Sequence, residues 1–456
     1  MLGKDDVLDR IADKFNVAQF VSVSFDTPKV VRHARINGVP GAKDLSVRAA
    51  VECLLNSNPE RKVNIRTFRT GESKGGEFIV GVQDALTVLN QIDRLSREGF
   101  SVIVNESIDR YDGGVSGVTI GDLVEFAPED SPRCVEKPGV CRLPRGIADS
   151  IFRSVYGVDL DFQASSRQRV EFSLHPIRRG YRNQHQIVWE VEDLTDDFDQ
   201  GNVRPKWPNR FSSFIGDKLF GLLVANTIGC KVPYTIAICR SVAPFVFGER
   251  THTNDFWSRT APSRQLPGKL PTKLGHMNPF TLLKSLEADA EETLASLLSQ
   301  ENVPSVFSGA SAMMDDGEVL VEGVAGSGDS FMLGVDAPSL IPQEVKEAVI
   351  RRVKFAASKL GPVRMEWVFD GNEVWTVQLH VGAISSDPHV IFQGNAERWV
   401  VFNVNEGLDS LRKLLVDTEG SSVGVRLQGD VGVTSHFGDL LRGRRIPSTL
   451  HRHNTQ

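Results

Sequence analysis

Markers of a secreted, disulfide-bonded or membrane-spanning protein are missing from this sequence. The five cysteines are odd in number and form no CxxC pair, which argues against both a disulfide framework and a structural zinc site. The longest apolar stretch, LFGLLVANTIG at 219–229, is too short and too polar to span a bilayer. The first residues, MLGKDDVLDRIADKF, lack the apolar segment of a secretory signal. We therefore expect a cytoplasmic protein without membrane partners.

A surplus of positive charge is also missing. The chain carries 52 basic and 58 acidic residues, a formal net charge of −6. This balance argues against extended binding of a nucleic-acid backbone. What is present is an ordinary globular composition, 40% hydrophobic and 24% charged over 456 residues, long enough for two or three domains.

Short β-branched runs alternate irregularly with helical periodicity along the chain. This pattern predicts an α+β or mixed α/β fold rather than a doubly wound Rossmann domain. The turns in MDDGEVLV at 314–321 and FDGNEVW at 369–375 indicate antiparallel hairpins. A polar, proline-bearing stretch at 192–210 is the best linker candidate. Helices are expected within 84–99, 281–300 and 342–361.

The two sides of that linker resemble each other. Four short matches occur in the same order, at offsets of 188 to 195 residues. Single matches of this kind are common by chance, but four in order at a nearly constant offset predict an internal duplication. The matched pairs are Arg66 with Arg259, Ser116-Gly117 with Ser308-Gly309, Glu171 with Glu366, and Glu190 with Gln378.

The hairpin predicted at 363–380 places Glu366 and Gln378 on opposite arms, with His380 on the same face as Gln378. If the arms pair, a carboxylate, an amide and an imidazole can converge. Oxygen ligands on a rigid sheet suit Mg²⁺, which takes phosphate oxygens as its other ligands. The alternative, on this stretch alone, is that these side chains simply face solvent.

Two further segments carry residues that could handle phosphate. Lys218 begins the helix predicted in GDKLFGLLVANTIG and could hold a phosphate together with the free N–H groups there, although an ordinary surface lysine also fits. In GDVGVTSHFGDLLRGRRIPS, Thr434 is the expected N-cap, which places Ser435 and His436 in the first helical turn. That position favours a neutral, nucleophilic imidazole and would stabilise an added phosphoryl group. The alternative is an exposed histidine.

Taken in order, these segments resemble the PEP-utilising dikinases, the family of pyruvate phosphate dikinase, PEP synthase and rifampicin phosphotransferase. GDVGVTSHFGDLLRGRRIPS is similar to the family's phosphohistidine motif, GG-x-TSHAA-x-x-AR-x-x-x-IP. MEWVFDGNEVWTVQLH looks like the E…Q-x-R end of its ATP-grasp domain. The lysine segment is similar to GGKG…VP-x-GF, SRTAPSRQLPGK to RSSA-x-x-ED-x-P, and the segment around Glu322 to SGV-x-FT…E…GLGE. The resemblance covers roughly 210–450.

The resemblance implies a duplicated ATP-grasp-like fold with a small C-terminal swivelling, phosphohistidine-like domain. The expected domains are a degenerate or acceptor-binding copy at 1–200, a nucleotide-binding ATP-grasp domain at 210–385 and the phosphohistidine-like domain at 386–456. The implied activity is a dikinase-type phosphotransfer. It passes the β-phosphate of ATP to an unidentified acceptor, expected to be a small molecule, and releases AMP and Pi. The implied cofactors are ATP and Mg²⁺.

The resemblance also assigns roles to individual residues. His436 becomes the covalent phosphoryl carrier, Arg259 a catalytic charge on the triphosphate, and Glu366 and Gln378 the metal ligands. The sequence departs from the family at His380, where the pattern has arginine, and in TSHFG, where it has TSHAA. The implied nucleotide-binding residues are Lys218, Arg259, Glu322, Gln378 and His380.

Two other functions stay open from the sequence. An ATP-grasp ligase would form an acyl-phosphate, release ADP and be indifferent to His436. A non-catalytic ATP-binding sensor built from two degenerate copies would bind nucleotide without turnover, and His380 in place of arginine supports it. The acceptor, the oligomeric state and nucleotide binding by the first copy are left open.

Overall fold

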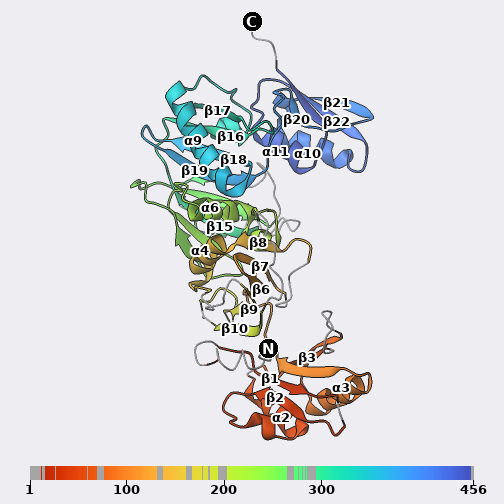
Figure 1. Ribbon diagram of the computed structural model, residues 1–456. Helices are drawn as coiled ribbons and strands as arrows, with labels where there is room; N and C mark the ends of the chain where they lie inside the picture. The colour runs from red at the N-terminus through yellow and green to blue at the C-terminus, as the bar shows by residue number, and fades with distance from the viewer. Residues whose placement is uncertain are drawn as a thin grey trace.

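The chain is seen here in a computed structural model. Its described residues form five β-sheets along an elongated molecule, with strands β1 to β5 at one end and the C-terminal strands β20 to β23 at the other (Figure 1). Among these residues, no helix is long and apolar enough to cross a membrane. The described residues are 12, 16–25, 27–58, 60–68, 76–130, 137–160, 167–176, 178–182, 185–193, 203–263, 272–275, 277–279, 281–282, 284 and 294–452.

The N-terminal half contains two antiparallel sheets, with strand orders β2-β1-β5-β3-β4 and β10-β9-β6-β7-β8. Ser46 and Asp84 are the N-caps of helices α2 and α3, which pack on the first sheet. Each of the two side chains accepts a hydrogen bond from a backbone N–H in the first turn of its helix. The elements are β1 Phe20–Val23, β2 Val31–Arg35, η1 Ala42–Asp44, α2 Val47–Ser57, β3 Val63–Phe68, β4 Phe78–Val82, α3 Ala85–Arg97, β5 Ser101–Glu106, β6 Val115–Ile120, β7 Leu123–Pro128, β8 Cys141–Pro144, α4 Arg145–Tyr156, β9 Gln168–His175 and β10 His185–Asp193.

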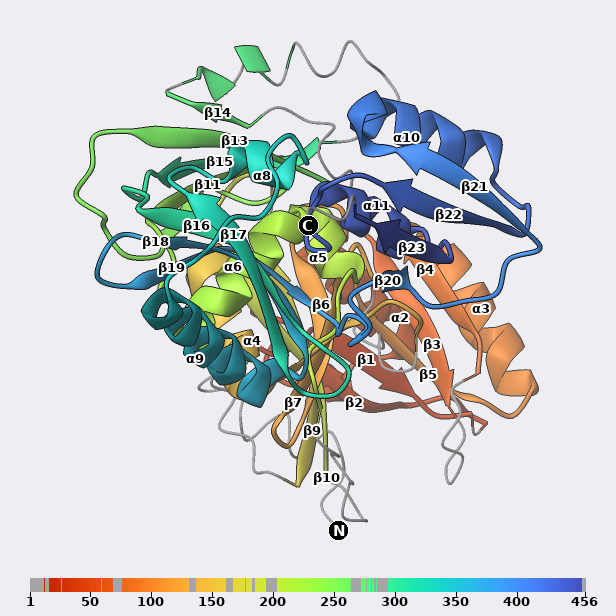
Figure 2. The ribbon, with the colours of Figure 1, turned by 90° about the horizontal axis from the view of Figure 1, so that it is seen from above.

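The next part of the chain contains two more antiparallel sheets, with orders β12-β11-β15-β13-β14 and β17-β16-β18-β19. Helix α9 covers the second of them (Figure 2). The elements are α5 Arg210–Ile215, α6 Asp217–Thr227, β11 Thr235–Cys239, β12 Phe245–Phe247, β13 Phe256–Pro262, β14 Lys273–Leu274, β15 Leu294–Glu301, β16 Phe307–Met313, β17 Val319–Ala325, α8 Asp329–Met332, α9 Gln343–Leu360, β18 Val363–Phe369 and β19 Val374–Val381.

The strand orders of the two halves correspond, as the predicted duplication requires. Strands β1 to β5 follow the same order as β11 to β15, and β7-β6-β9-β10 follows the same order as β17-β16-β18-β19. Even a register shift recurs. Glu171 lies opposite Glu190 and Glu366 opposite Gln378, and in each hairpin the pairing shifts by one residue directly afterwards. The matched pairs in the sequence therefore occupy equivalent places in the fold.

The hydrophobic cores do not follow the division at 192–210. The β1–β5 sheet has its own core. The β6–β10 sheet instead shares one continuous core with the second half, where Phe152 and Phe172 belong to the same cluster as Phe211 and Phe220. Residues 194–202 of the linker lie outside the described part. The repeats are thus separate in sequence but joined in packing.

The C-terminal strands form a mixed sheet of order β20-β23-β22-β21, in which β21, β22 and β23 are parallel. Helices α10 and α11 make the crossovers between the parallel strands, as parallel neighbours require. The core of this unit includes Ala312 of β16 and packs against Leu320 of β17, so the unit lies directly beside the β16–β19 sheet (Figure 2). Its elements are β20 Val390–Phe392, β21 Arg398–Asn403, η2 Val404–Glu406, α10 Gly407–Asp417, β22 Val423–Gln428, α11 His436–Gly443 and β23 Ser448–His451.

The mixed α/β architecture, the helices α3 and α9 and the two hairpins are as predicted. The helix expected at 281–300 is wrong over its last part, where Leu294–Glu301 is strand β15. This strand is central in its sheet, and seven of its eight residues are buried. The spacing of Leu294, Leu297 and Leu298 matches a helical face, and burial of both strand faces removes the alternation that would have marked a strand.

Helix α6 approaches strand β19 closely at Gly221. A Cβ on Gly221 would lie 2.1 Å from the carbonyl oxygen of Leu379, so backbone would have to move. We expect Gly221→Ala to lower the free energy of unfolding by about 1–3 kcal/mol through overpacking. Chemical denaturation measures this. Gly146→Ala in α4 is the matched control, because a Cβ there meets nothing within 4 Å. Equal stability of the two variants would contradict the close packing of α6.

Candidate functional site

The candidate site lies between the β11–β15 and β16–β19 sheets, where Arg259 of β13 reaches across. Its Nη1 donates to Gln300 Oε1 at 3.1 Å and to the carbonyl oxygen of Val377 on β19 at 2.8 Å. Glu366 on β18 lies directly opposite Gln378 on β19. Arg259 and Glu366 line the same cavity, and Gln378 is the register partner of Glu366.

Lys218 enters the same region from the first turn of α6. Gly221 allows this helix to lie against β19, which places the partly buried lysine beside the strands. Burial lowers the pKa of Lys218, the positive charge of Arg259 lowers it further, and the carboxylates of Glu366 and Asp439 oppose the change. Residues from β13, β18 and α11 thus act electrostatically on one ammonium group of α6.

His380, which replaces the arginine of the family pattern, is held neutral. Burial, together with the charges of Arg364 and Lys218, lowers its pKa to about 3. Its Nε2 lies 2.7 Å from Nε2 of Gln378, and a neutral imidazole nitrogen there accepts a hydrogen bond from the Gln378 amide. This bond orients the Gln378 amide, whose carbonyl oxygen is the atom that could bind a metal. Because its pKa is lowered this far, His380 is neutral near pH 7 and supplies no positive charge to a phosphate.

Arg364 supplies a positive charge at the same place. It lies directly opposite His380 in the β18–β19 register and two residues before Glu366. Sequence reasoning missed this residue. The sequence feature that indicates Arg364 is the alternation of side chains along β18, because residues two apart, such as Arg364 and Glu366, lie on one face of a strand.

His436 is the first residue of α11, and the N-cap is Ser435 rather than the predicted Thr434. The hydroxyl of Thr434 is used elsewhere, because it donates to Glu322 Oε2 at 2.8 Å. The Ser435 hydroxyl donates to the carbonyl oxygen of Gly432 at 2.7 Å and makes no capping bond to the helix. The helix therefore begins one residue later than expected, with His436 still at its N-terminus.

Glu322 lies in register with Glu366 and Gln378 across the sheet, because Ala310 of β16 pairs with Glu322 on one side and with Glu366 on the other. Its buried carboxylate accepts from the Thr434 N–H at 3.0 Å and from Arg452 at 2.8 Å. These bonds join β17 to the C-terminal unit. Protein donors thus engage both carboxylate oxygens, and Glu322 has the position of a docking contact rather than of a nucleotide ligand.

Asp439, one turn after His436, connects α11 with the β16–β19 sheet. Arg364 Nη1 lies 2.7 Å from its Oδ1, and His436 Nδ1 lies 3.6 Å from its Oδ2. Burial alone would raise the pKa of Asp439, but His436, Arg364 and Arg442 outweigh burial and hold that pKa well below its usual range. Asp439 was also missed from the sequence, although its i,i+3 spacing from His436 predicts proximity on a helix.

A cavity of about 80 Å³ opens at the same sheet-to-sheet boundary. It extends from Arg259 and Glu366 toward the end of β15, and the glycine-rich segment 323–334 closes one side of it. The lining includes Trp257, Gln300, Glu301, Asn302, Val303, Ser308, Gly309, Ser327, Gly328, Asp329 and Met332.

The equivalent cleft of the first repeat is filled by ion pairs. Arg66, which corresponds to Arg259, lies 3.3 Å from Glu190 and 3.9 Å from Glu171. Arg169 lies 2.8 Å from Glu171 on its other side. The side chains that match the candidate metal ligands of the second repeat thus neutralise arginines instead.

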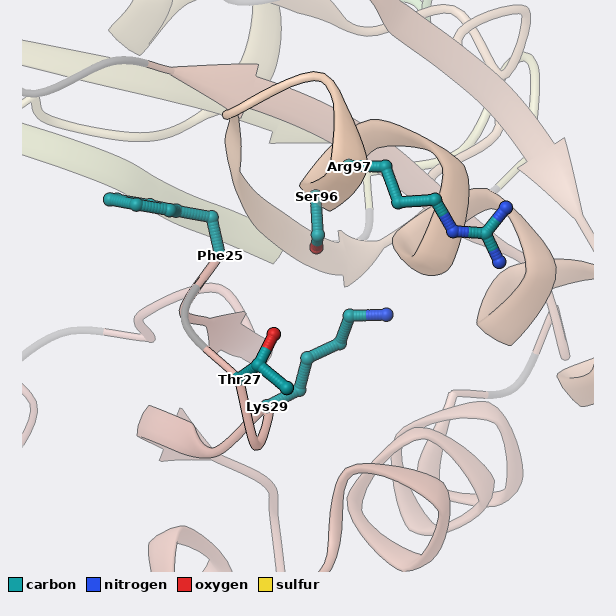
Figure 3. Close-up of a pocket in the computed structure, with 5 residues that line it drawn as sticks. All are labelled: Phe25, Thr27, Lys29, Ser96 and Arg97. Atoms are coloured by element: carbon teal, nitrogen blue, oxygen red, sulfur yellow. The ribbon is translucent and has the colours of Figure 1, made fainter.

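A larger cavity of about 390 Å³ lies near the β1–β5 sheet, lined by Phe25, Thr27, Lys29, Ser96 and Arg97 (Figure 3). Lys29 forms an ion pair with Asp93, so one of the two cations here is already neutralised. This cavity lies at the opposite end of the molecule from α11 and contains none of the residues that the sequence singles out (Figure 1).

Searches of protein families and of curated proteins find no match to the chain. Solved structures match over about 38% of it, at low similarity. They include an L-amino acid ligase from Bacillus licheniformis (11% identity, TM-score 0.25, 42% of that chain) and a D-alanine–D-alanine ligase from Helicobacter pylori (12%, 0.26, 52%). A macrocyclase, MdnB from Microcystis aeruginosa, matches at 13% identity and TM-score 0.22 over 54% of its length. The chain thus spans about half the length of these structures, and overlaps this limited do not identify the fold.

Proposed function

We propose that the cleft between the β11–β15 and β16–β19 sheets binds ATP and transfers a phosphoryl group from it, in the manner of ATP-grasp enzymes. The observation that carries the proposal is the convergence of Lys218, Arg259 and Glu366, which come from three separate elements. Phosphoryl transfer demands positioning and neutralisation of the triphosphate charge, and two cations beside one cleft serve that demand.

Glu366 and Gln378 would hold Mg²⁺ in this cleft. The described residues contain no group of three or more acidic, histidine or cysteine side chains that could enclose a metal. Mg²⁺ in nucleotide sites commonly takes one or two protein ligands, with waters and phosphate oxygens completing its shell. One carboxylate opposite one amide oxygen fits that chemistry, and the ion would neutralise charge on the phosphates.

The finer proposal is a dikinase-type reaction with His436 as the phosphoryl carrier. His436 lies 3.6 Å from Asp439, which lies 2.7 Å from Arg364, two residues before Glu366 on β18, and this places the proposed carrier histidine near the proposed ATP cleft. A nitrogen lone pair of His436 attacks the β-phosphorus, and AMP leaves with the bridging oxygen and its electron pair. Water then cleaves the terminal phosphate as Pi, and the remaining phosphohistidine passes its phosphoryl group to an acceptor.

An ATP-grasp ligase is the alternative, and the solved structures of low similarity are ligases by name, which points toward it rather than toward a dikinase. Their TM-scores of 0.25 and 0.26 are too low to carry the choice. A ligase would pass the γ-phosphate to a carboxylic acid, release ADP and leave no label on histidine. The two functions therefore differ in their products.

Incubation with β-labelled and γ-labelled ATP in separate reactions tests the proposal. We expect AMP, labelled Pi from γ-labelled ATP, and acid-labile protein label from β-labelled ATP alone. ADP without protein label, in the presence of carboxylic acids and amines, would assign a ligase. Nucleotide binding without either product would contradict both enzymes and favour the sensor.

A further inference from the structure

We propose that Asp439 is a positioning residue that orients His436 so that its Nε2 is the nitrogen that takes the phosphoryl group, and that Arg364 holds Asp439 in place from the β16–β19 sheet. This inference rests on the proposed phosphohistidine function and adds how that histidine is oriented. Asp439 lies three residues after His436, within the first turn of α11.

The geometry around His436 Nδ1 is the first support. This nitrogen is buried and has no hydrogen-bond partner within the described residues, and the Asp439 Oδ2 lies 3.6 Å away. A small rotation of the ring closes that distance to a hydrogen bond. The side chain of His436 is 15% exposed and that of Asp439 is 23% exposed, so the pair is largely shielded from water.

The ionisation of Asp439 decides the tautomer of the histidine. Ionised Asp439 can only accept, so it favours the imidazole that carries its proton on Nδ1. The lone pair is then on Nε2. When Nε2 attacks phosphorus and AMP leaves with the electron pair of the broken P–O bond, the ring becomes cationic and keeps its proton on Nδ1. The carboxylate stabilises that positive charge, as an acid beside a catalytic histidine does in other enzymes.

Arg364 makes this orientation depend on the docked C-terminal unit. Asp439 Oδ1 lies 2.7 Å from Arg364 Nη1 on β18 and 3.1 Å from Arg442 Nη2 on its own helix. Together with the bonds of Glu322 to Thr434, the Arg364–Asp439 pair joins α11 to the β16–β19 sheet. Asp439 is therefore fully held only while α11 lies against the ATP cleft.

Asp439→Asn is the decisive variant. An amide can donate to Nδ1 and so favours the opposite tautomer, with the proton on Nε2. We expect AMP formation to slow by about 100-fold to 10,000-fold, as for the equivalent change beside other catalytic histidines. We also expect the residual phosphohistidine to shift from the Nε2 to the Nδ1 isomer, which phosphorus NMR of the phosphoprotein distinguishes. ATP binding by calorimetry should change little.

Two further variants keep the test decisive. Asp409→Asn in α10 is the matched control, because Asp409 is exposed and pairs only with Arg412 among the contacts described. Asp439→Glu keeps the charge, and it should retain the Nε2 isomer even if Asp439→Asn folds poorly. An Nε2 isomer and an unchanged rate in Asp439→Asn, with the wild type phosphorylated, would overturn the positioning role alone. Absence of phosphohistidine from the wild type would instead overturn the proposed function.

Discussion

Replacing His436 with alanine is expected to remove the acid-labile phosphoprotein. It should also slow AMP formation by about 1000-fold or more, which is a typical effect of removing a catalytic nucleophile. The reason is that no covalent intermediate can form without the imidazole. ATP binding should persist, because Lys218, Arg259 and Glu366 remain. The measurement is a single-turnover AMP assay with β-labelled ATP, run beside an equilibrium nucleotide-binding assay.

His451→Ala is the matched control for that variant. His451 ends β23 of the same C-terminal unit, and its exposed side chain has a weak 3.3 Å contact with Thr449. It should form AMP and phosphoprotein at the wild-type rate. Equal label on the wild type and on His436→Ala would contradict the proposal that His436 carries the phosphoryl group. It would leave the ATP cleft intact and place the label on another residue, whereas absence of label from both proteins, with ADP as the product, would assign the ligase.

Local pattern was enough to predict the hairpin that carries the proposed metal ligands. The alternation of side chains in β18 and β19 places Glu366 and Gln378 correctly, because strand faces repeat every two residues whatever surrounds them. The same reasoning, applied one step further, would have included Arg364. The family pattern instead places the phosphate arginine two residues after Gln378, where this chain has His380.

Contacts between distant segments could not be predicted in the same way. Glu322 matches the family segment in sequence, yet its carboxylate binds Thr434 and Arg452, which lie 112 and 130 residues further along the chain. The ion pair between Arg364 and Asp439 also depends on how the C-terminal unit sits against the β16–β19 sheet. No periodicity within either segment contains that information.

The first repeat shows the same limit. The sequence matches Glu171 with Glu366 and Arg66 with Arg259, and the strand registers agree. Whether a cleft is available depends on the distance between two sheets. In the first repeat Arg66 reaches the carboxylates of Glu171 and Glu190, whereas in the second repeat Arg259 bonds to the backbone of β19. The same substitution of glutamate by glutamine should therefore have different effects in the two repeats.

Glu366→Gln is expected to slow AMP formation by about 100-fold to 1000-fold, the usual cost of removing one preorganised charge from a transfer site. The amide keeps the shape of the side chain but removes the negative charge that would hold Mg²⁺. The Mg²⁺ concentration for half-maximal activity should therefore rise. Activity is measured across a Mg²⁺ titration at saturating ATP. An unchanged Mg²⁺ dependence would contradict the role of Glu366 as a metal ligand.

Glu171→Gln in the first repeat makes the equivalent substitution where ion pairs fill the cleft. We expect AMP formation per folded molecule to stay at the wild-type level, with one nucleotide bound per chain in both proteins. Stability should fall by about 1–3 kcal/mol, because Arg66 and Arg169 lose a buried carboxylate but keep Glu190 and Glu192 as partners. Calorimetry gives the nucleotide stoichiometry and chemical denaturation gives the stability. Two nucleotides per chain, or a loss of activity equal to that of Glu366→Gln, would show that the first repeat takes part in the reaction.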